Sequence, residues 1–277
     1  MNKTITVLLI LGCLVVRPQA QNTVPPPVAP AQPGSASAQD PGAQKARTLL
    51  DKMIAALGGN AYLTYTSRSE QGRTFSFYGG QAKGLGTDYW LFWQYPDKDR
   101  TEVTKKRDIV YVHNGDKGFE ITFRGTAAMA DKEMEDYLRQ RAHSLEVVLR
   151  EWLKDPKTLV LYGGPGIVDN RMAEQVTLLN AKDDAVTIAI DADNYLPLRK
   201  SFSYRDPVDN LKTEEADTYG SYRPEQGMMT AHTIVHSRNG EVASQRFITH
   251  LEYNPQLSAS LFDANVTYDP QNLKDKR

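Results

Sequence analysis

A long succession of short segments in which apolar and polar residues alternate most constrains the fold of this chain. The alternation begins at Tyr62 and continues to Tyr253. Ile109–His113 and Gly118–Phe123 flank one Asn-Gly turn, and a second Asn-Gly turn lies near residue 240. Alternation with a period of two is typical of β-strands, and tight Asn-Gly turns join antiparallel neighbours. The sequence therefore predicts about eleven strands, mostly antiparallel.

Two amphipathic segments interrupt this pattern. Residues 45–57 place apolar side chains at helical spacing and end at a Gly-Gly pair, which can supply the left-handed stop of a helix. A second, longer helix is expected between Asp131, which can cap its start, and Pro156, which marks its end. The many strands and two sizeable helices together predict an α+β fold with one strongly curved antiparallel sheet covered by helices. The segment Gly163–Gly166 is interpreted as a turn.

The two ends of the chain differ in composition from this domain. Residues 1–20 carry a basic residue ahead of an apolar stretch, as a signal peptide does. Cys13 follows a glycine within that stretch, so lipid attachment at Cys13 is the alternative to soluble export. Residues 21–44 hold six prolines and are expected to form a Pro-rich disordered linker. We assign the domain to residues 45–264 and a C-terminal tail to residues 265–277.

Charge and motif content exclude several classes of function. A net charge of −1 gives no electrostatic basis for binding nucleic acid. Cys13 is the sole cysteine, so the exported domain can form neither a disulfide nor a thiolate metal site. His232 and His236 are four residues apart in a predicted strand, where they would lie about 13 Å apart, too far to share one metal. We interpret both as half-buried strand histidines. Hydrolase, metal-binding and nucleotide-binding motifs are missing from the sequence, so we expect no enzyme activity, no metal and no cofactor.

One predicted strand is apolar on both of its faces. Tyr89 and Leu91 share a face that lacks the polar residues Asp88 and Gln94. Such a strand fits either plain core under the helices or the wall of a cavity for an apolar ligand. The cavity hypothesis makes this face concave, and its expected lining is Tyr89, Leu91, Trp93, Tyr95, Phe119, Ile121, Phe123, Met134, Leu138, Leu145, Leu149, Trp152, Leu196, Leu198 and Phe202.

Several short motifs occur in an order that resembles the outer-membrane lipoprotein-sorting (LolA/LolB-like) superfamily. They include the end of the opening helix, a charged corner after an aromatic strand, an Asn-Gly hairpin and a closing Asn-Pro motif. The matching segments are Ala56–Gly59, Pro96–Glu102, Asn114–Glu120, Ile190–Arg199, Tyr219–Met228 and Asn254–Phe262.

The resemblance covers residues 45–264 and implies an incomplete antiparallel β-barrel whose helices cover a hydrophobic cavity. It also implies a monomeric, non-enzymatic periplasmic carrier that binds acyl chains of lipids or lipoproteins, with the envelope membrane or a transport partner as further contacts. An exported scaffold or interaction domain without a ligand cavity is the alternative. A lipidated Cys13 would instead anchor the chain to the membrane.

Overall fold

The computed structural model describes residues 40–264. The expected signal peptide, Cys13, almost all of the expected linker and the C-terminal tail lie outside the described residues. The domain opens with two helices, α1 (Pro41–Leu57) and α2 (Asn60–Thr64). The strands are β1 (Ser67–Tyr78), β2 (Gln81–Ala82), β3 (Thr87–Gln94), β4 (Lys98–Val103), β5 (Ile109–Asn114), β6 (Lys117–Thr122), β7 (Gly125–Ala128), β8 (Leu159–Val168), β9 (Arg171–Leu179), β10 (Ala185–Asp191), β11 (Pro197–Arg205), β12 (Lys212–Glu225), β13 (Met228–Arg238) and β14 (Glu241–Tyr253).

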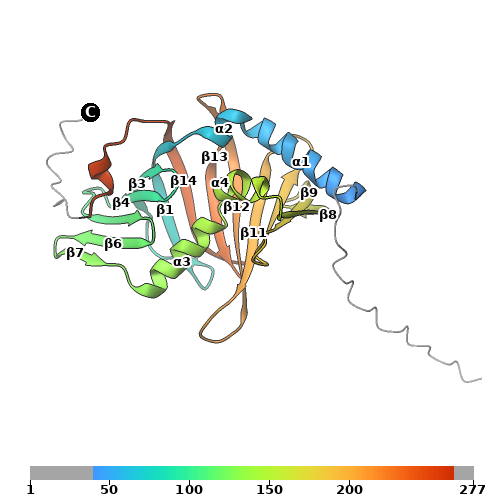
Figure 1. The fold of residues 1–277 in the computed structure, drawn as a ribbon. Coiled ribbons are helices and arrows are strands. Elements are labelled where there is room, and N and C mark those ends of the chain that lie inside the picture. Colours follow the sequence, from blue (N-terminus) through green and yellow to red (C-terminus); the bar gives the residue numbers. More distant parts are fainter. Residues whose placement is uncertain (1–39, 265–277) are drawn as a thin grey trace, which may run out of the picture. The chain divides into compact units, whose positions relative to one another are not determined.

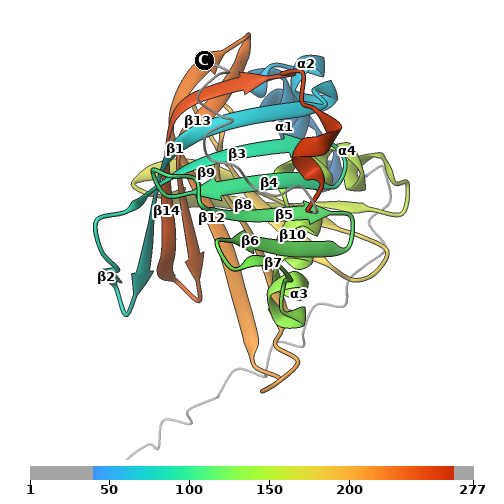
Figure 2. The same ribbon diagram turned by 90° about the vertical axis from the view of Figure 1, so that its left-hand side faces the viewer.

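All fourteen strands belong to one antiparallel sheet that does not close. The order across the sheet is β7-β6-β5-β4-β3-β1-β14-β13-β12-β11-β10-β9-β8, and the short strand β2 pairs with β1. Figure 2 shows β1 and β3 to β7 one below another along one end of this sheet. The first and last long strands, β1 and β14, pair in its interior, where Arg68 is opposite Tyr253. The predicted α+β fold with one curved antiparallel sheet is confirmed.

The strand count of about eleven was too low. The two-residue β2 and four-residue β7 are too short to give an alternating pattern. The segment Gly163–Gly166, expected to be a turn, lies inside β8. Because β8 is the last strand of the sheet, Pro165 needs no hydrogen-bond partner on the open side. The glycines and proline therefore mark an edge strand.

Helix α1 begins earlier than predicted and covers part of one sheet face. Asp40 caps it by accepting a hydrogen bond from the Gly42 backbone, and Pro41 occupies the first turn, where its missing N–H costs nothing. The helix therefore includes residues 41–44, which were expected to belong to the linker. Gly58 ends it with a φ of 127°, as predicted from the Gly-Gly pair. The buried face of α1 contributes Leu50 and Met53 to the main core, beside the inner residues of β8 to β10.

The predicted long helix is two helices separated by a break. Helix α3 (Asp131–Ala142) ends at His143, and α4 (Leu145–Arg150) begins after Ser144. The Ser144 side chain accepts a hydrogen bond from the Val147 backbone, so it caps a new helix where a continuous one was expected. A short 3₁₀ segment, η1 (Trp152–Lys154), follows α4. Asp131 does not cap α3 but occupies its first turn, where its negative charge is favourable. Figure 1 shows α1, α3 and α4 on the same side of the sheet.

The opposite face of the sheet is covered at one end by the C-terminal part of the domain. A second 3₁₀ segment, η2 (Ala259–Phe262), lies against β4 and β5. The Arg100 guanidinium donates to the backbone carbonyl of Leu261 there. Val110 and Val112 of β5 and Ile121 of β6 form a small separate core nearby. The N-terminal helix and the C-terminal segment therefore contact different parts of the sheet.

Candidate ligand cavity

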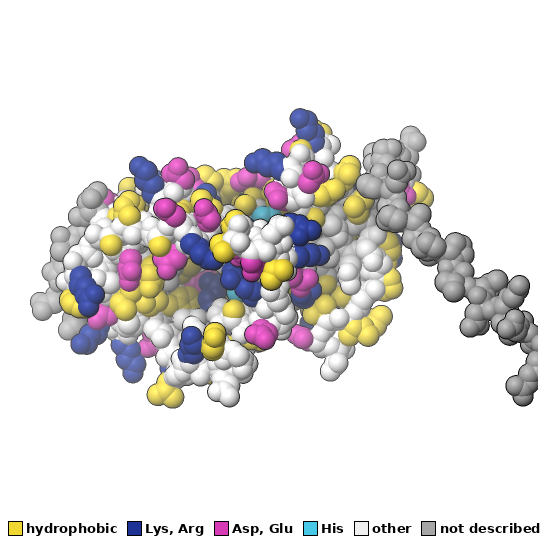
Figure 3. All heavy atoms as spheres, turned by 90° about the horizontal axis from the view of Figure 1, so that it is seen from below, with side chains coloured by type: hydrophobic (Ala, Val, Ile, Leu, Met, Phe, Trp, Pro, Cys, Tyr) yellow, Lys and Arg dark blue, Asp and Glu magenta, His cyan; other side chains and the backbone are white. Residues whose placement is uncertain are grey.

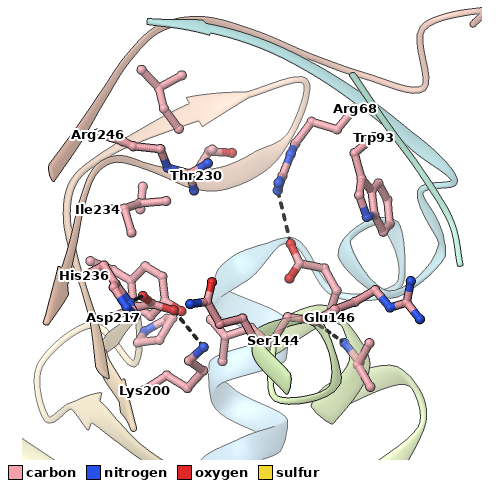
Figure 4. A pocket seen from close by; sticks show the side chains of 18 of the residues that line it. Arg68, Trp93, Ser144, Glu146, Lys200, Asp217, Thr230, Ile234, His236 and Arg246 are labelled. Atoms are coloured by element: carbon pink, nitrogen blue, oxygen red, sulfur yellow. Dashed lines mark hydrogen bonds and ion pairs between the residues drawn. The ribbon is translucent and has the colours of Figure 1, made fainter. Parts of the chain in front are cut away.

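A cavity of about 530 Å³ lies between the concave face of the sheet and the helical segment that runs from α3 into α4. This volume is within the range of roughly 300–1,000 Å³ that is typical of small-molecule sites. Strands β1, β3, β4 and β11 to β14 contribute one part of the lining, and the helices α1 to α4, mainly residues 137–147, contribute another. Figure 3 shows Lys and Arg side chains gathered with hydrophobic ones near the middle of the lower face. The close view in Figure 4 shows charged side chains surrounding the space.

Much of the lining is aromatic or aliphatic. Most of these side chains come from strands that are far apart in the sequence, because the curvature of the sheet turns their inner faces toward one space, and the others come from α1, α2 and α4. They can bury acyl chains or another apolar group, with about 25 cal/mol gained for each Å² of apolar surface removed from water. They are Leu57, Tyr62, Trp93, Tyr95, Leu145, Val147, Phe202, Tyr219, Tyr222, Met229, Ile234, Ile248, Leu251 and Tyr253.

A charged cluster formed by Lys200, Asp217 and His236 lies on the lining of β11 to β13. The Lys200 ammonium is 2.7 Å from one Asp217 carboxylate oxygen, and the His236 Nδ1 is 2.8 Å from the other. Burial alone would raise the pKa of Asp217, but the Lys200 charge and the hydrogen bond from His236 outweigh it and hold the pKa well below its usual value. Asp217 therefore remains an anion, and this side of the cavity is ionic.

A second charged cluster connects the sheet to α4. Glu146, in the first turn of α4, accepts hydrogen bonds from Arg68 at 3.1 Å and from the Tyr65 hydroxyl at 3.0 Å. Burial tends to raise the pKa of Glu146, but the adjacent Arg68 charge helps to hold it below the usual value. Glu70 accepts hydrogen bonds from Arg246 at 3.2 Å and from the Tyr89 hydroxyl at 2.9 Å. Figure 4 shows Arg68 and Arg246 on the side of the cavity opposite Lys200.

The predicted face of β3 points to the concave side of the sheet. Only the end of this face near Trp93 lines the cavity. Trp93 and Tyr95 are lining residues. Tyr89 is buried farther along β3, where its hydroxyl is bonded to Glu70, and it does not line the cavity. Leu91 is half-buried and is also not among the lining residues.

The three aromatic and aliphatic residues expected from β6 lie elsewhere. Phe119 and Ile121 are opposite Val112 and Val110, and Ile121 packs with these valines in the small separate core. Phe123 follows the strand and is 89% exposed. The prediction for this hairpin chose the wrong face, because alternation gives two faces without showing which one is concave.

The remaining predicted residues are divided between the cavity and solid core. Leu145 and Phe202 line the cavity. Met134 packs over Gly118, and Leu138 is half-buried on α3. The main core takes up Leu149, Trp152 and Leu196. Leu198 packs with Ala173 and Ala189 in another small cluster, at a β-bulge between β10 and β11.

Sequence reasoning missed the ionic side chains of the cavity. The signal was weak, since a charged residue in an alternating strand is most simply interpreted as facing water. The two strand histidines were recognised but not their partners. His232 is buried with its Nδ1 2.9 Å from the Ile248 carbonyl, and His236 is half-buried against Asp217. Among residues 40–264, no cluster of three or more potential metal ligands occurs.

Several solved structures share this fold at low sequence identity. A DUF1329 family protein from Desulfovibrio piger aligns with a TM-score of 0.55 at 12% identity, covering 79% of this chain and 97% of the other. A putative outer membrane lipoprotein-sorting protein domain from Vibrio parahaemolyticus aligns with a TM-score of 0.54 at 11% identity, covering 80% and 98%. A LolA superfamily protein from Nitrosomonas europaea aligns at 10% identity with a TM-score of 0.49. The two alignments with TM-scores above 0.5 confirm the resemblance to lipoprotein-sorting proteins at the level of the fold.

Comparison by sequence gives no such match. No family model and no curated protein matches the chain. Within residues 40–264, the helices are too short or too polar to cross a bilayer.

Proposed function

We propose that this protein is a non-enzymatic carrier that binds an acyl chain of a lipid or lipoprotein in its half-barrel cavity. The observation that carries the proposal is the cavity of about 530 Å³ between the concave sheet face and the helical segment from α3 to α4, in which more than half of the lining residues are aromatic or aliphatic. The fold shared with a putative lipoprotein-sorting domain supports the same class of ligand. A packed scaffold domain would need no space of this size at the centre of its sheet.

Export to the bacterial envelope is the second part of the proposal. The apolar segment within residues 1–20 supports a signal peptide, and Cys13 offers lipid attachment as the alternative. Mass analysis of the N-terminus of the mature protein from an envelope fraction tests this directly. A chain that begins at or after residue 21 supports soluble export, a diacylated Cys13 supports anchoring, and an intact Met1 contradicts export.

Native mass spectrometry of the purified protein tests for a ligand. Under gentle conditions we expect a mass increment that disappears after extraction with organic solvent. The delipidated protein should then bind a fluorescent fatty-acyl probe. Repeated spectra of the bare chain, together with no binding of the probe, would contradict the carrier function and favour a scaffold.

A substitution that fills the cavity tests whether the ligand binds there. Ser244 lies on β14 and lines the cavity, so Ser244→Trp should occupy part of the space and reduce probe binding about tenfold or more. Ser203 is exposed on β11, so Ser203→Trp introduces the same side chain without filling the cavity. Equal probe binding by both folded variants would show that the probe binds elsewhere.

A further inference from the structure

We infer that the ligand is an amphiphile with an anionic head group, and that Lys200 and Arg246 bind this group inside the cavity. The inference rests on the proposed carrier function and adds the class of ligand. It follows from the unequal hydrogen-bonding state of the cations and carboxylates that surround the space.

The two cations retain unused donors. Arginine carries five N–H donors, and the one hydrogen bond found for the Arg246 side chain among the described residues goes to Glu70 at 3.2 Å. The Lys200 ammonium has three donors, and the polar partner that the described structure gives it is Asp217 at 2.7 Å. Both side chains line the cavity; that of Lys200 is 4% exposed and that of Arg246 is 32% exposed. An anion in the cavity would accept from the unused donors in place of water, and hydrogen bonds to charged groups are the stronger ones.

The carboxylates, in contrast, already have two or more donors each. Asp217 is bonded to Lys200 and His236. Glu146 accepts from Arg68 and from the Tyr65 hydroxyl. Glu70 accepts from Arg246 and Tyr89 through one oxygen, but it is not a lining residue. A ligand that supplies acceptors therefore gains more here than a ligand that supplies donors. This difference selects an anion over a cation, although the numbers of positive and negative side chains are similar.

The strand register places the polar residues in one row across the sheet. Lys200 is opposite Asp217, Asp217 is opposite His236, and His236 is opposite Ser244. Arg246 is two residues beyond Ser244 on the same strand face, so it is a diagonal neighbour of His236, at a spacing of about 7–8 Å. The row and Arg246 form one polar stretch of the lining, which runs from Lys200 on β11 to Arg246 on β14 and along which a carboxylate or phosphate head group can lie.

Apolar lining begins next to this patch and continues away from it. Tyr219 and Ile234 are opposite each other, each two residues from the Asp217–His236 pair along β12 and β13. Met229 lies farther from that pair on β13. Leu251 and Trp93 continue the apolar lining on β14 and β3. An amphiphile can therefore place its head group on the polar row and its chain against these residues. A purely apolar ligand would exclude water from the polar row and offer no acceptor to the donors of Lys200 and Arg246, which is unfavourable.

Three probes of equal chain length test the inference, namely a sixteen-carbon fatty acid, the alkyl phosphate and the uncharged alcohol. Binding to the delipidated protein is measured by displacement of the fluorescent acyl probe. We expect the acid or the phosphate to bind about tenfold or more tightly than the alcohol, because hydrogen bonds to charged groups are stronger than neutral ones. Preference for the acid indicates a free fatty acid as the natural ligand, and preference for the phosphate indicates a phospholipid.

Two variants assign the selectivity to the named residues. Lys200→Gln and Arg246→Gln should each remove most of the preference for the anion while leaving alcohol binding nearly unchanged. Arg199→Gln is the matched control, since Arg199 is adjacent to Lys200 on β11 but pairs with Glu214 instead of the cavity cluster. A thermal unfolding transition for each variant establishes that it is folded.

The outcomes separate this inference from the carrier function. Equal binding of the acid, phosphate and alcohol to the unmodified protein would overturn the anionic head group but leave the carrier function supported, and this comparison requires no variant. Selectivity that survives in both folded Gln variants would overturn the assignment to Lys200 and Arg246. Failure of all three probes, and of the fluorescent probe, would contradict the carrier function itself.

Discussion

Leu149 provides a quantitative test of how α4 packs on the sheet. It is 1% exposed and belongs to the same core cluster as Leu50 and Met53. Leu149→Ala removes about three methylene-sized groups, or about 2.4 kcal/mol of transfer free energy. The cavity left in a closely packed core raises the expected loss to about 3–4 kcal/mol. In a domain of this size 1 kcal/mol changes the Tm by about 2–4 °C, so the Tm should fall by about 6–16 °C.

Urea unfolding followed by tryptophan fluorescence, with and without a bound fatty acid, measures this loss. Because Leu149 does not line the cavity, the same loss is expected in both conditions. Leu138, half-buried on α3, serves as the control, and Leu138→Ala should cost about 1 kcal/mol. If Leu149→Ala costs less than about 1 kcal/mol in the free protein, the argument that α4 is part of the solid core fails. A loss confined to the ligand-bound protein would show instead that α4 is a lid.

Three further substitutions test other contacts of the domain. Burial holds the pKa of His143 below its usual 6.5, so the unfolded chain binds more protons below that pH and the free energy of unfolding decreases as the pH falls; His143→Phe should flatten that part of a thermal-unfolding pH profile. Arg150 is buried and donates to two backbone carbonyls near α2, so Arg150→Lys should lower the free energy of unfolding by about 2 kcal/mol, and an unchanged urea midpoint would contradict this role. Asp191 is buried and accepts two backbone hydrogen bonds in the turn after β10, so Asp191→Ala should cost about 1–3 kcal/mol in the same measurement, whereas a loss below 0.5 kcal/mol, roughly that of a surface substitution, would show that the turn does not need the carboxylate.

The fold class could be predicted because its signals are local. Alternation and Asn-Gly turns identify strands and hairpins without reference to any distant part of the chain, as for β5 and β6. The stop of α1 at Gly58 was equally local. The pairing of β1 with β14 was not, because it joins residues nearly two hundred positions apart and no turn connects them.

The errors in the helices and the cavity lining have physical causes that depend on a few residues. A continuous apolar stripe runs through residues 134–153, yet Ser144 can cap a helix, and the cap gives two helices at an angle that the stripe alone does not show. At Leu198 a β-bulge between β10 and β11 shifts the alternation, and the side chain packs outside the main core. A break or bulge of one residue thus turns side chains toward a different face from the one that a regular period predicts.

The polar row of the cavity could not be found in any single strand, because each strand contributes one member. Lys200 stands between Arg199 and Ser201 on β11, and Asp217 stands on a strand that also carries surface charges. Each resembles a solvent-facing residue until the register of four strands places them opposite one another. Ionic side chains inside a half-barrel are unfavourable unless they are paired or bind a ligand. Asp217 is satisfied by its pairs, whereas Lys200 and Arg246 keep unused donors, and this difference connects the register of the sheet to the chemistry of the ligand.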